Sequence, residues 1–307
     1  MTSRNMAAVF VIALLMPLKA QPSPQRVHAE MRNIEYHFTD SIAVHIVHLE
    51  GELVPAGDAG MPIFDDPLSF VIAVASAEIS ITTDGLANVL NQYAFAAPDA
   101  PMKAIRVSTR GDKLHFRGRL HSKGDIPFES EGSLSVTPQS EIRVHLEKIK
   151  AAHLPVKGLM DLLGTSVARL IDTRKVRGVR AERDDLLLTP AELFPPPHLQ
   201  GSLSSIALRG NEIVEEYKGP TAPAKLRGNY MAYHGGQLRF GKLTMRDTDL
   251  VLLDLDPQDP FDFYLDHYKE QLAAGYTKIT PGFGLRSYFR DYNKLTPKQR
   301  LPPATNH

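Results

Sequence analysis

Apolar and polar residues alternate along much of the chain, and this pattern predicts a protein built mainly from β-strands. Ile42, Val44 and Ile46 are separated by single residues, as expected for a strand with one buried face. The clearest stretch is 105–146, where apolar residues alternate with Lys, Arg and His between turn-forming residues. Such alternation predicts an antiparallel meander with one apolar face and one basic face.

Three segments show helical spacing instead. The first has its apolar residues at i, i+3, i+4 and i+7 after Thr83 or Asp84, either of which can cap a helix: Leu86, Val89, Leu90 and Tyr93. The second begins at Pro155 and carries an apolar stripe as far as Ile171. The third is expected to begin near Pro260, with Phe261, Tyr264, Leu265, Tyr268 and Leu272 on one side.

These elements predict an α+β fold with a mainly antiparallel, strongly curved β-sheet that wraps amphipathic helices. We expect a curved-sheet and helix domain with an apolar groove over residues 26–195. Pro195, Pro196 and Pro197 form a stiff connector. Residues 196–295 either continue the sheet or form a smaller β-rich subdomain with a C-terminal helix, and residues 296–307 form a loose tail.

The first twenty residues have the pattern of a secretion signal. Arg4 supplies the positive charge, an apolar run follows from Ala7 to Met16, and Ala20 is a small residue before a plausible cleavage point. The run is shorter than the roughly 20 apolar residues that span a bilayer. We therefore expect residues 1–20 to be removed and the mature protein to be periplasmic or extracellular.

Composition narrows the functional classes. The 307-residue chain has 35 Lys and Arg against 35 Asp and Glu, so no overall field favours nucleic acid. It has no cysteine, which excludes thiol chemistry, disulfides and lipid attachment through cysteine. The Gly-x-Ser-x-Gly, His-Glu-x-x-His and phosphate-loop motifs are absent. We expect no cofactor and no catalytic activity.

An acidic run near residue 254 offers two weaker alternatives. Asp254, Asp256 and Asp259 are a possible Ca²⁺ site, although the run lacks the glycine and terminal glutamate of the twelve-residue calcium loop. Asp254, Asp256 and Asp262 are the candidate carboxylates if the protein is instead a hydrolase of an envelope polymer. Capping of the expected third helix explains these aspartates more simply.

The basic face of the meander predicts contacts with an anion such as a lipid headgroup. The candidate contacts are Lys113, Arg117, Arg119, Arg143 and Lys148. The other interpretation is a solvated strand face. Aromatic residues for base stacking are scarce there, which argues against nucleic acid and leaves a lipid, another apolar molecule or the membrane surface as partner.

A resemblance to a known protein family supports a lipid or another apolar molecule as the partner. Residues 81–171 hold Ile-Thr-Thr-Asp-Gly-Leu-Ala-Asn-Val-Leu, then the meander, then Lys150-Ala-Ala-His-Leu-Pro-Val-Lys-Gly-Leu-Met-Asp-Leu-Leu. This order of elements resembles the LmeA-like, tubular-lipid-binding-like family of exported phospholipid-binding proteins. The part with Leu238-Arg-Phe-Gly-Lys-Leu-Thr-Met and Asp259-Pro-Phe-Asp-Phe-Tyr is similar to an uncharacterised family of exported bacterial proteins, and it departs from the shorter lipid-binding pattern.

The resemblance implies a curved sheet around a helix with a tubular apolar groove, and hence a non-catalytic, exported protein that binds lipid or another apolar ligand. The expected groove residues are Leu86, Val89, Leu90, Tyr93, Leu159, Met160 and Leu163. A structural protein that binds an envelope partner through an exposed sheet edge is the remaining alternative.

Overall fold

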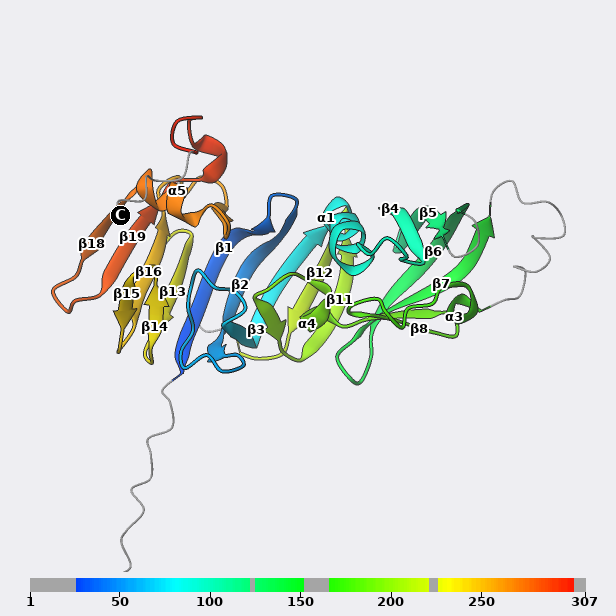
Figure 1. The fold of residues 1–307 in the computed structure, drawn as a ribbon, viewed down its shortest axis with the longest axis horizontal. Helices are drawn as coiled ribbons and strands as arrows, with labels where there is room; N and C mark the ends of the chain where they lie inside the picture. Colours follow the sequence, from blue (N-terminus) through cyan, green and yellow to red (C-terminus); the bar gives the residue numbers. More distant parts are fainter. Residues whose placement is uncertain (1–25, 122–124, 152–165, 221–225, 301–307) are drawn as a thin grey trace, which may run out of the picture.

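The computed structural model describes residues 26–121, 125–151, 166–220 and 226–300. The protein is mainly antiparallel β-sheet, as the alternation predicts, and is drawn out along one axis with its strands running across that axis (Figure 1). None of the helices in these ranges is long and apolar enough to cross a membrane.

The larger sheet has eleven strands. Their order is β11-β12-β3-β2-β1-β13-β16-β19-β18, with β10 also paired to β3 and β17 to β1. Strands from both sides of Pro195–Pro197 therefore belong to one sheet. The bounds are β1 Val27–Thr39, β2 Ile42–Pro55, β3 Phe70–Thr82, β10 His198–Gln200, β11 Leu203–Arg209, β12 Glu212–Tyr217, β13 Tyr230–His234, β16 Asp249–Asp254, β17 Phe261–Tyr264, β18 Tyr276–Ile279 and β19 Leu285–Phe289.

Strand β1 shares one of its edges between two partners. Residues 28–32 pair antiparallel with β13, and residues 34–37 pair parallel with β17. Asn33 lies between the two ladders with a φ of 52°. Because asparagine tolerates the left-handed conformation better than most residues, it suits this change of partner.

The second sheet has six strands in the order β4-β5-β6-β7-β9-β8 and lies at the other end of the long axis (Figure 1). Its bounds are β4 Met102–Arg110, β5 Lys113–Leu120, β6 Ile126–Val136, β7 Ile142–Ala151, β8 Val179–Glu182 and β9 Asp185–Leu188. Strands β4 to β7 form the meander that the alternation over 105–146 predicts, and β9 and β8 extend it at the β7 edge. The smaller elements are the π-helix η1 Leu90–Ala94, the hairpin β14 Leu238–Phe240 and β15 Leu243–Met245, and the short helices α3 Val167–Leu170, α4 Pro190–Leu193, α5 Tyr268–Ala273 and 3₁₀ η3 Tyr292–Lys294.

Helix α1 (Thr83–Val89) forms as the sequence predicts but begins earlier than expected. Its N-cap is Thr82, whose Oγ1 accepts a 3.0 Å hydrogen bond from the Gly85 N–H, and the expected caps Thr83 and Asp84 lie within the first turn. It packs against β2, β3 and β4 and continues directly into η1. Inward-facing side chains of both sheets and of α1 belong to one apolar core cluster, which extends from Val27 to Phe289.

The expected third helix is wrong over its first half. Residues 261–264 form β17, and α5 begins only at Tyr268. Phe261 and Phe263 are fully buried beside β1, so pairing with an existing strand outweighs a helical spacing that a short segment matches by coincidence. Asp262 consequently lies within a strand and does not cap the expected helix. The secretion signal, and most of the expected second helix, lie outside the described residues.

Candidate apolar binding site

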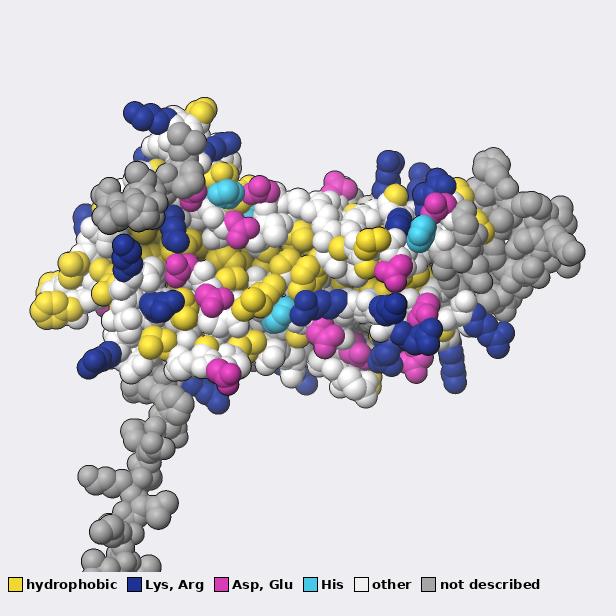
Figure 2. Space-filling view, viewed as in Figure 1, with side chains coloured by type: hydrophobic (Ala, Val, Ile, Leu, Met, Phe, Trp, Pro, Cys, Tyr) yellow, Lys and Arg dark blue, Asp and Glu magenta, His cyan; other side chains and the backbone are white. Residues whose placement is uncertain are grey.

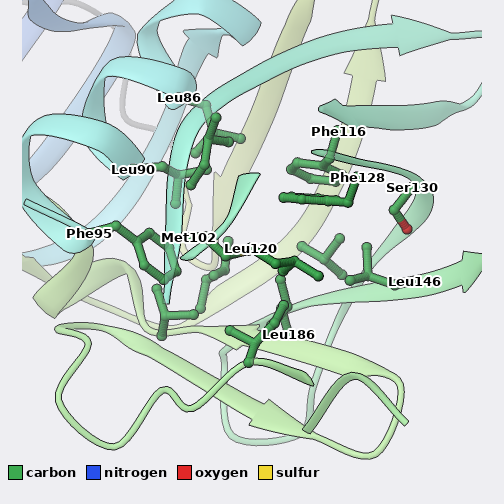
Figure 3. A pocket seen from close by; sticks show the side chains of 15 residues that line it. Leu86, Leu90, Phe95, Met102, Phe116, Leu120, Phe128, Ser130, Leu146 and Leu186 are labelled. Atoms are coloured by element: carbon green, nitrogen blue, oxygen red, sulfur yellow. The ribbon is translucent and has the colours of Figure 1, made fainter. Parts of the chain in front are cut away.

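An apolar cavity lies between α1 with η1 and the inner face of the six-stranded sheet (Figure 3). Its volume is about 30 Å³. All but one of the lining side chains are apolar. The lining consists of Leu86, Leu90, Phe95, Met102, Ile105, Phe116, Leu120, Phe128, Ser130, Val144, Leu146, Ile171, Val179, Leu186 and Leu188.

Helical and strand periodicity explain why these side chains line the cavity. Leu86 and Leu90 are one helical turn apart and therefore share the face of α1 and η1 that meets the sheet. Phe116 and Leu120 have the inward phase of β5, and between them Gly118 leaves space for a ring. A Cβ atom at Gly118 would come within 2.9 Å of the Phe128 ring. Glycine at an inward strand position is thus the sequence signal for this packing, and alternation alone overlooks it.

Ser130 is the one polar member of the lining. Its side chain is buried on the inward face of β6, and within the described residues its Oγ has no hydrogen-bond partner. Burying a hydroxyl without a partner costs about 1–3 kcal/mol. The cavity volume equals roughly that of one water molecule, so the site as it stands is too small for an acyl chain.

Two smaller cavities continue the first toward the larger sheet. One of about 20 Å³ shares Leu86, Val144 and Leu188 with the main cavity. Another of about 10 Å³ shares Ile81, Phe194 and Glu215 with that second one. The three form an apolar seam from the inner face of the six-stranded sheet to the junction of the two sheets.

Glu215 is the one carboxylic acid among the described residues that line this seam. It lies on β12 in phase with Ile213 and Tyr217, and burial raises the pKa of its carboxyl from 4.5 to about 7. The Tyr217 hydroxyl donates a 3.0 Å hydrogen bond to Glu215 Oε2, and burial together with this carboxyl raises the Tyr217 pKa well above its usual value. We did not predict this residue, although the alternation of Ile213, Glu215 and Tyr217 places it on the inward face.

The expected groove residues separate into three groups. Leu86 and Leu90 line the cavity. Val89 is fully buried but does not line it, and Tyr93 is partly buried with the Arg177 guanidinium 5.4 Å from its ring centroid. Leu159, Met160 and Leu163 lie outside the described residues.

The expected anion-binding cations are mostly held by carboxylates of other strands in the same sheet. Lys113 lies 2.7 Å from Glu147, Arg117 lies 2.9 Å from Glu129, and Arg143 lies 3.5 Å from Asp185. Arg119 is exposed on β5. Lys148 belongs to β7, but its side chain lies outside the described part. Cross-strand ion pairs therefore neutralise much of the charge on this face.

Two aspartates of the acidic run form a cluster with Asp291, which the sequence does not predict to be part of it. Carboxylate oxygens of Asp254, Asp256 and Asp291 lie within 4.8 Å of one another, and Asp291 is fully buried. Burial raises the Asp291 pKa to about 6 and raises that of Asp254 as well. Lys294 Nζ lies 2.9 Å from both Asp291 and Asp259, and so places a positive charge at this cluster.

Asp262 is joined to this cluster by its backbone N–H, which donates a 3.1 Å hydrogen bond to Asp291 Oδ1, but its carboxylate faces His37 and a polar cleft of about 620 Å³. His37, which lines that cleft, stacks on Tyr264 with ring centroids 3.7 Å apart, and its Nε2 lies 2.8 Å from Asp262 Oδ1. Among the residues that the structure describes, neither ring nitrogen of His37 has a partner in well-aligned hydrogen-bond geometry. Glu35 also lines the cleft, and burial raises its pKa. Of the acids that the hydrolase interpretation groups together, Asp254 and Asp256 have their carboxylates at the cluster, whereas the Asp262 carboxylate faces His37.

Comparison with protein-family models, with curated proteins and with solved structures found no match to this chain.

Proposed function

We propose that this protein is a non-catalytic carrier that binds the apolar chain of a lipid or a similar ligand between α1 with η1 and the six-stranded sheet. The observation that carries the proposal is the cavity beneath α1, whose lining is apolar apart from Ser130. In this reading the sheet curves around α1 in the way that the LmeA-like resemblance implies.

The energetics favour an elongated apolar ligand. Each methylene moved from water into such a lining contributes about 0.8 kcal/mol. An acyl chain that follows the seam from Phe128 toward Phe194 would exchange its contacts with water for contacts with apolar side chains along its whole length. Because the present volumes are small, binding requires the walls to separate, and each separated side chain gives up packing that the ligand must restore.

The wall formed by η1 is the part best suited to such movement. Leu90 lies at the start of this π-helix, and π-helical segments are rare and are frequent at functional sites. The unpartnered hydroxyl of Ser130 favours a ligand that brings one hydrogen-bonding group into the cavity, because pairing this hydroxyl would remove its burial cost.

Native mass spectrometry of the gently purified protein, followed by solvent extraction, tests the proposal. We expect a lipid or fatty acid at one copy per chain. Val144→Ile adds a methylene to the cavity wall and should weaken binding about tenfold. Val251→Ile is the matched control, because Val251 is equally buried in a separate cluster outside the cavity. A protein that neither retains a ligand nor takes up added fatty acid overturns the proposal.

We also infer that the protein is exported after removal of residues 1–20, because that segment combines Arg4 with the apolar run from Ala7 to Met16. The mass of the chain recovered from the envelope fraction of its source tests this inference. A cleaved N-terminus near Gln21 is expected. Recovery of the intact chain from the cytoplasm would contradict it.

A further inference from the structure

The hairpin of β18 and β19 ends in an exposed apolar tip. It forms the end of the long axis opposite the six-stranded sheet, and hydrophobic side chains gather at this end of the surface (Figures 1 and 2). Ile279 is 71% exposed and Phe283 is 89% exposed, the largest values among the exposed large hydrophobic residues. Side chains of this size at the extremity of an elongated molecule can reach a partner before the rest of the surface does.

The turn holds Phe283 outward in an ordered conformation. The Phe283 N–H donates to the Thr280 carbonyl oxygen at 2.9 Å, and the Gly284 N–H donates to Thr280 Oγ1 at 2.9 Å. Phe283 has a φ of 63°, a conformation that bulky residues rarely adopt. The backbone is therefore strained at Phe283, the residue whose ring is exposed to solvent. Backbone strain of this kind is concentrated at functional positions.

The edge of this sheet is poorly suited to adding a strand from another protein. Strand β18 has only four residues, and Lys278 lies among them, two features by which natural edges resist strand pairing. The apolar surface is instead concentrated at the turn. Behind it, the Lys278 ammonium lies 5.2 Å from the ring centroid of Tyr276 and 5.6 Å from that of Tyr288.

We propose that this tip docks on a lipid bilayer, with Ile279 and Phe283 inserted among the acyl chains. Lys278 then meets the lipid phosphates, and the two tyrosines lie at headgroup level, where amphipathic side chains are favoured. Burial of the two apolar side chains should strengthen membrane partitioning on the order of 100-fold, which gives reversible attachment. This docking does not depend on the cavity, although it would bring a carrier to the source of its ligand.

The chain contains no tryptophan, so Phe283→Trp introduces a single fluorophore at the tip. With vesicles of phosphatidylcholine and phosphatidylglycerol, we expect its emission to shift to shorter wavelength and to be quenched by brominated acyl chains. Leu68→Trp is the control, because Leu68 is 70% exposed on the loop between β2 and β3. Its emission should stay unchanged, and an equal response from both variants overturns the proposal.

Flotation with the same vesicles gives a second readout. The double variant Ile279→Ser, Phe283→Ser should lose association about 100-fold. A wild-type protein that fails to float, or a double variant that floats equally well, overturns the proposal. So does a wild-type dimer in sedimentation that the double variant dissociates, since the tip would then bind a second copy. Fatty-acid uptake in vesicle-free solution should be unchanged in the double variant, which separates this proposal from the carrier function.

Discussion

Asn33 Nδ2 donates a 2.8 Å hydrogen bond to Oδ1 of Asn229, and this contact joins β1, at the point where it changes partner, to the residue that precedes β13. Asn33 Oδ1 in turn lies 3.0 Å from His45 Nε2. Asn229 Nδ2 donates to Asp254 Oδ2 at 2.8 Å and also to the carbonyl oxygen of Asp259. A single pair of amides therefore couples β1 to the acidic run of the C-terminal part.

Substitutions of Asn33 separate two contributions to the free energy of unfolding, that of its backbone conformation and that of its side-chain hydrogen bonds. Asn33→Gly keeps the backbone freedom that a φ of 52° requires but loses the side-chain hydrogen bonds, and should lower the free energy of unfolding by about 1–2 kcal/mol. Asn33→Ala also adds backbone strain and should cost about 1 kcal/mol more. Urea unfolding of the three proteins checks this order. Equal stability of the Gly and Ala variants would show that the conformation imposes no strain.

Two buried serines should respond in opposite directions to removal of the hydroxyl. Ser130→Ala removes an unpartnered group and should raise the free energy of unfolding by about 1 kcal/mol. Ser287→Ala removes a hydroxyl that is equally buried but lies 3.0 Å from Thr277 Oγ1, and should lower it by about 1 kcal/mol. Thermal and urea unfolding of ligand-free protein measure both. Destabilisation by Ser130→Ala would mean that this hydroxyl has a partner in solution.

Glu215 should make the stability of the fold depend on pH. Below about pH 4.5 its carboxyl is protonated in both the folded and the unfolded chain. Between 4.5 and about 7 only the folded chain keeps the proton, so the free energy of unfolding falls as the pH rises through this range, by roughly 3 kcal/mol in all.

Glu215→Gln is neutral throughout and isolates this effect. The difference in unfolding free energy between Glu215→Gln and the wild type should grow in favour of the variant from pH 4.5 to pH 7 and then stay constant. Other titrating groups cancel in the difference. A difference that does not change with pH would place the Glu215 pKa near its ordinary value.

Lys294 should determine how the acidic cluster responds to calcium. Its ammonium lies 2.9 Å from Asp291 and from Asp259, so the wild-type melting temperature should be insensitive to millimolar Ca²⁺. Lys294→Met removes that charge from beside Asp254, Asp256 and Asp291. The variant should be less stable without calcium and regain stability when Ca²⁺ is added. A wild-type protein stabilised by Ca²⁺ as strongly as the variant would contradict this role.

The sequence predicts the elements whose period is long and regular. The strands of 105–146 follow from alternation, and helical spacing predicts α1, although its cap is Thr82 rather than Thr83 or Asp84. The helix predicted over Phe261–Tyr264 is wrong, because four residues cannot distinguish the helical period from the strand period and only pairing with the distant strand β1 decides between them. Leu86 and Leu90 could be placed at the cavity from helical spacing, whereas Val179 reaches it through tertiary packing that no local pattern records.

The divided edge of β1 also bears on how the chain reaches its final form. Ile34 pairs with Phe261, so one of the first strands to be synthesised has an open edge until the residues of β17 have been made. Contacts between such distant positions slow folding, because the entropy cost of closing a long loop must be met before the stabilising contacts form. During synthesis this open edge is vulnerable to aggregation, and a chain that stops before residue 261 can assemble the β1–β2–β3 ladder but cannot complete the sheet.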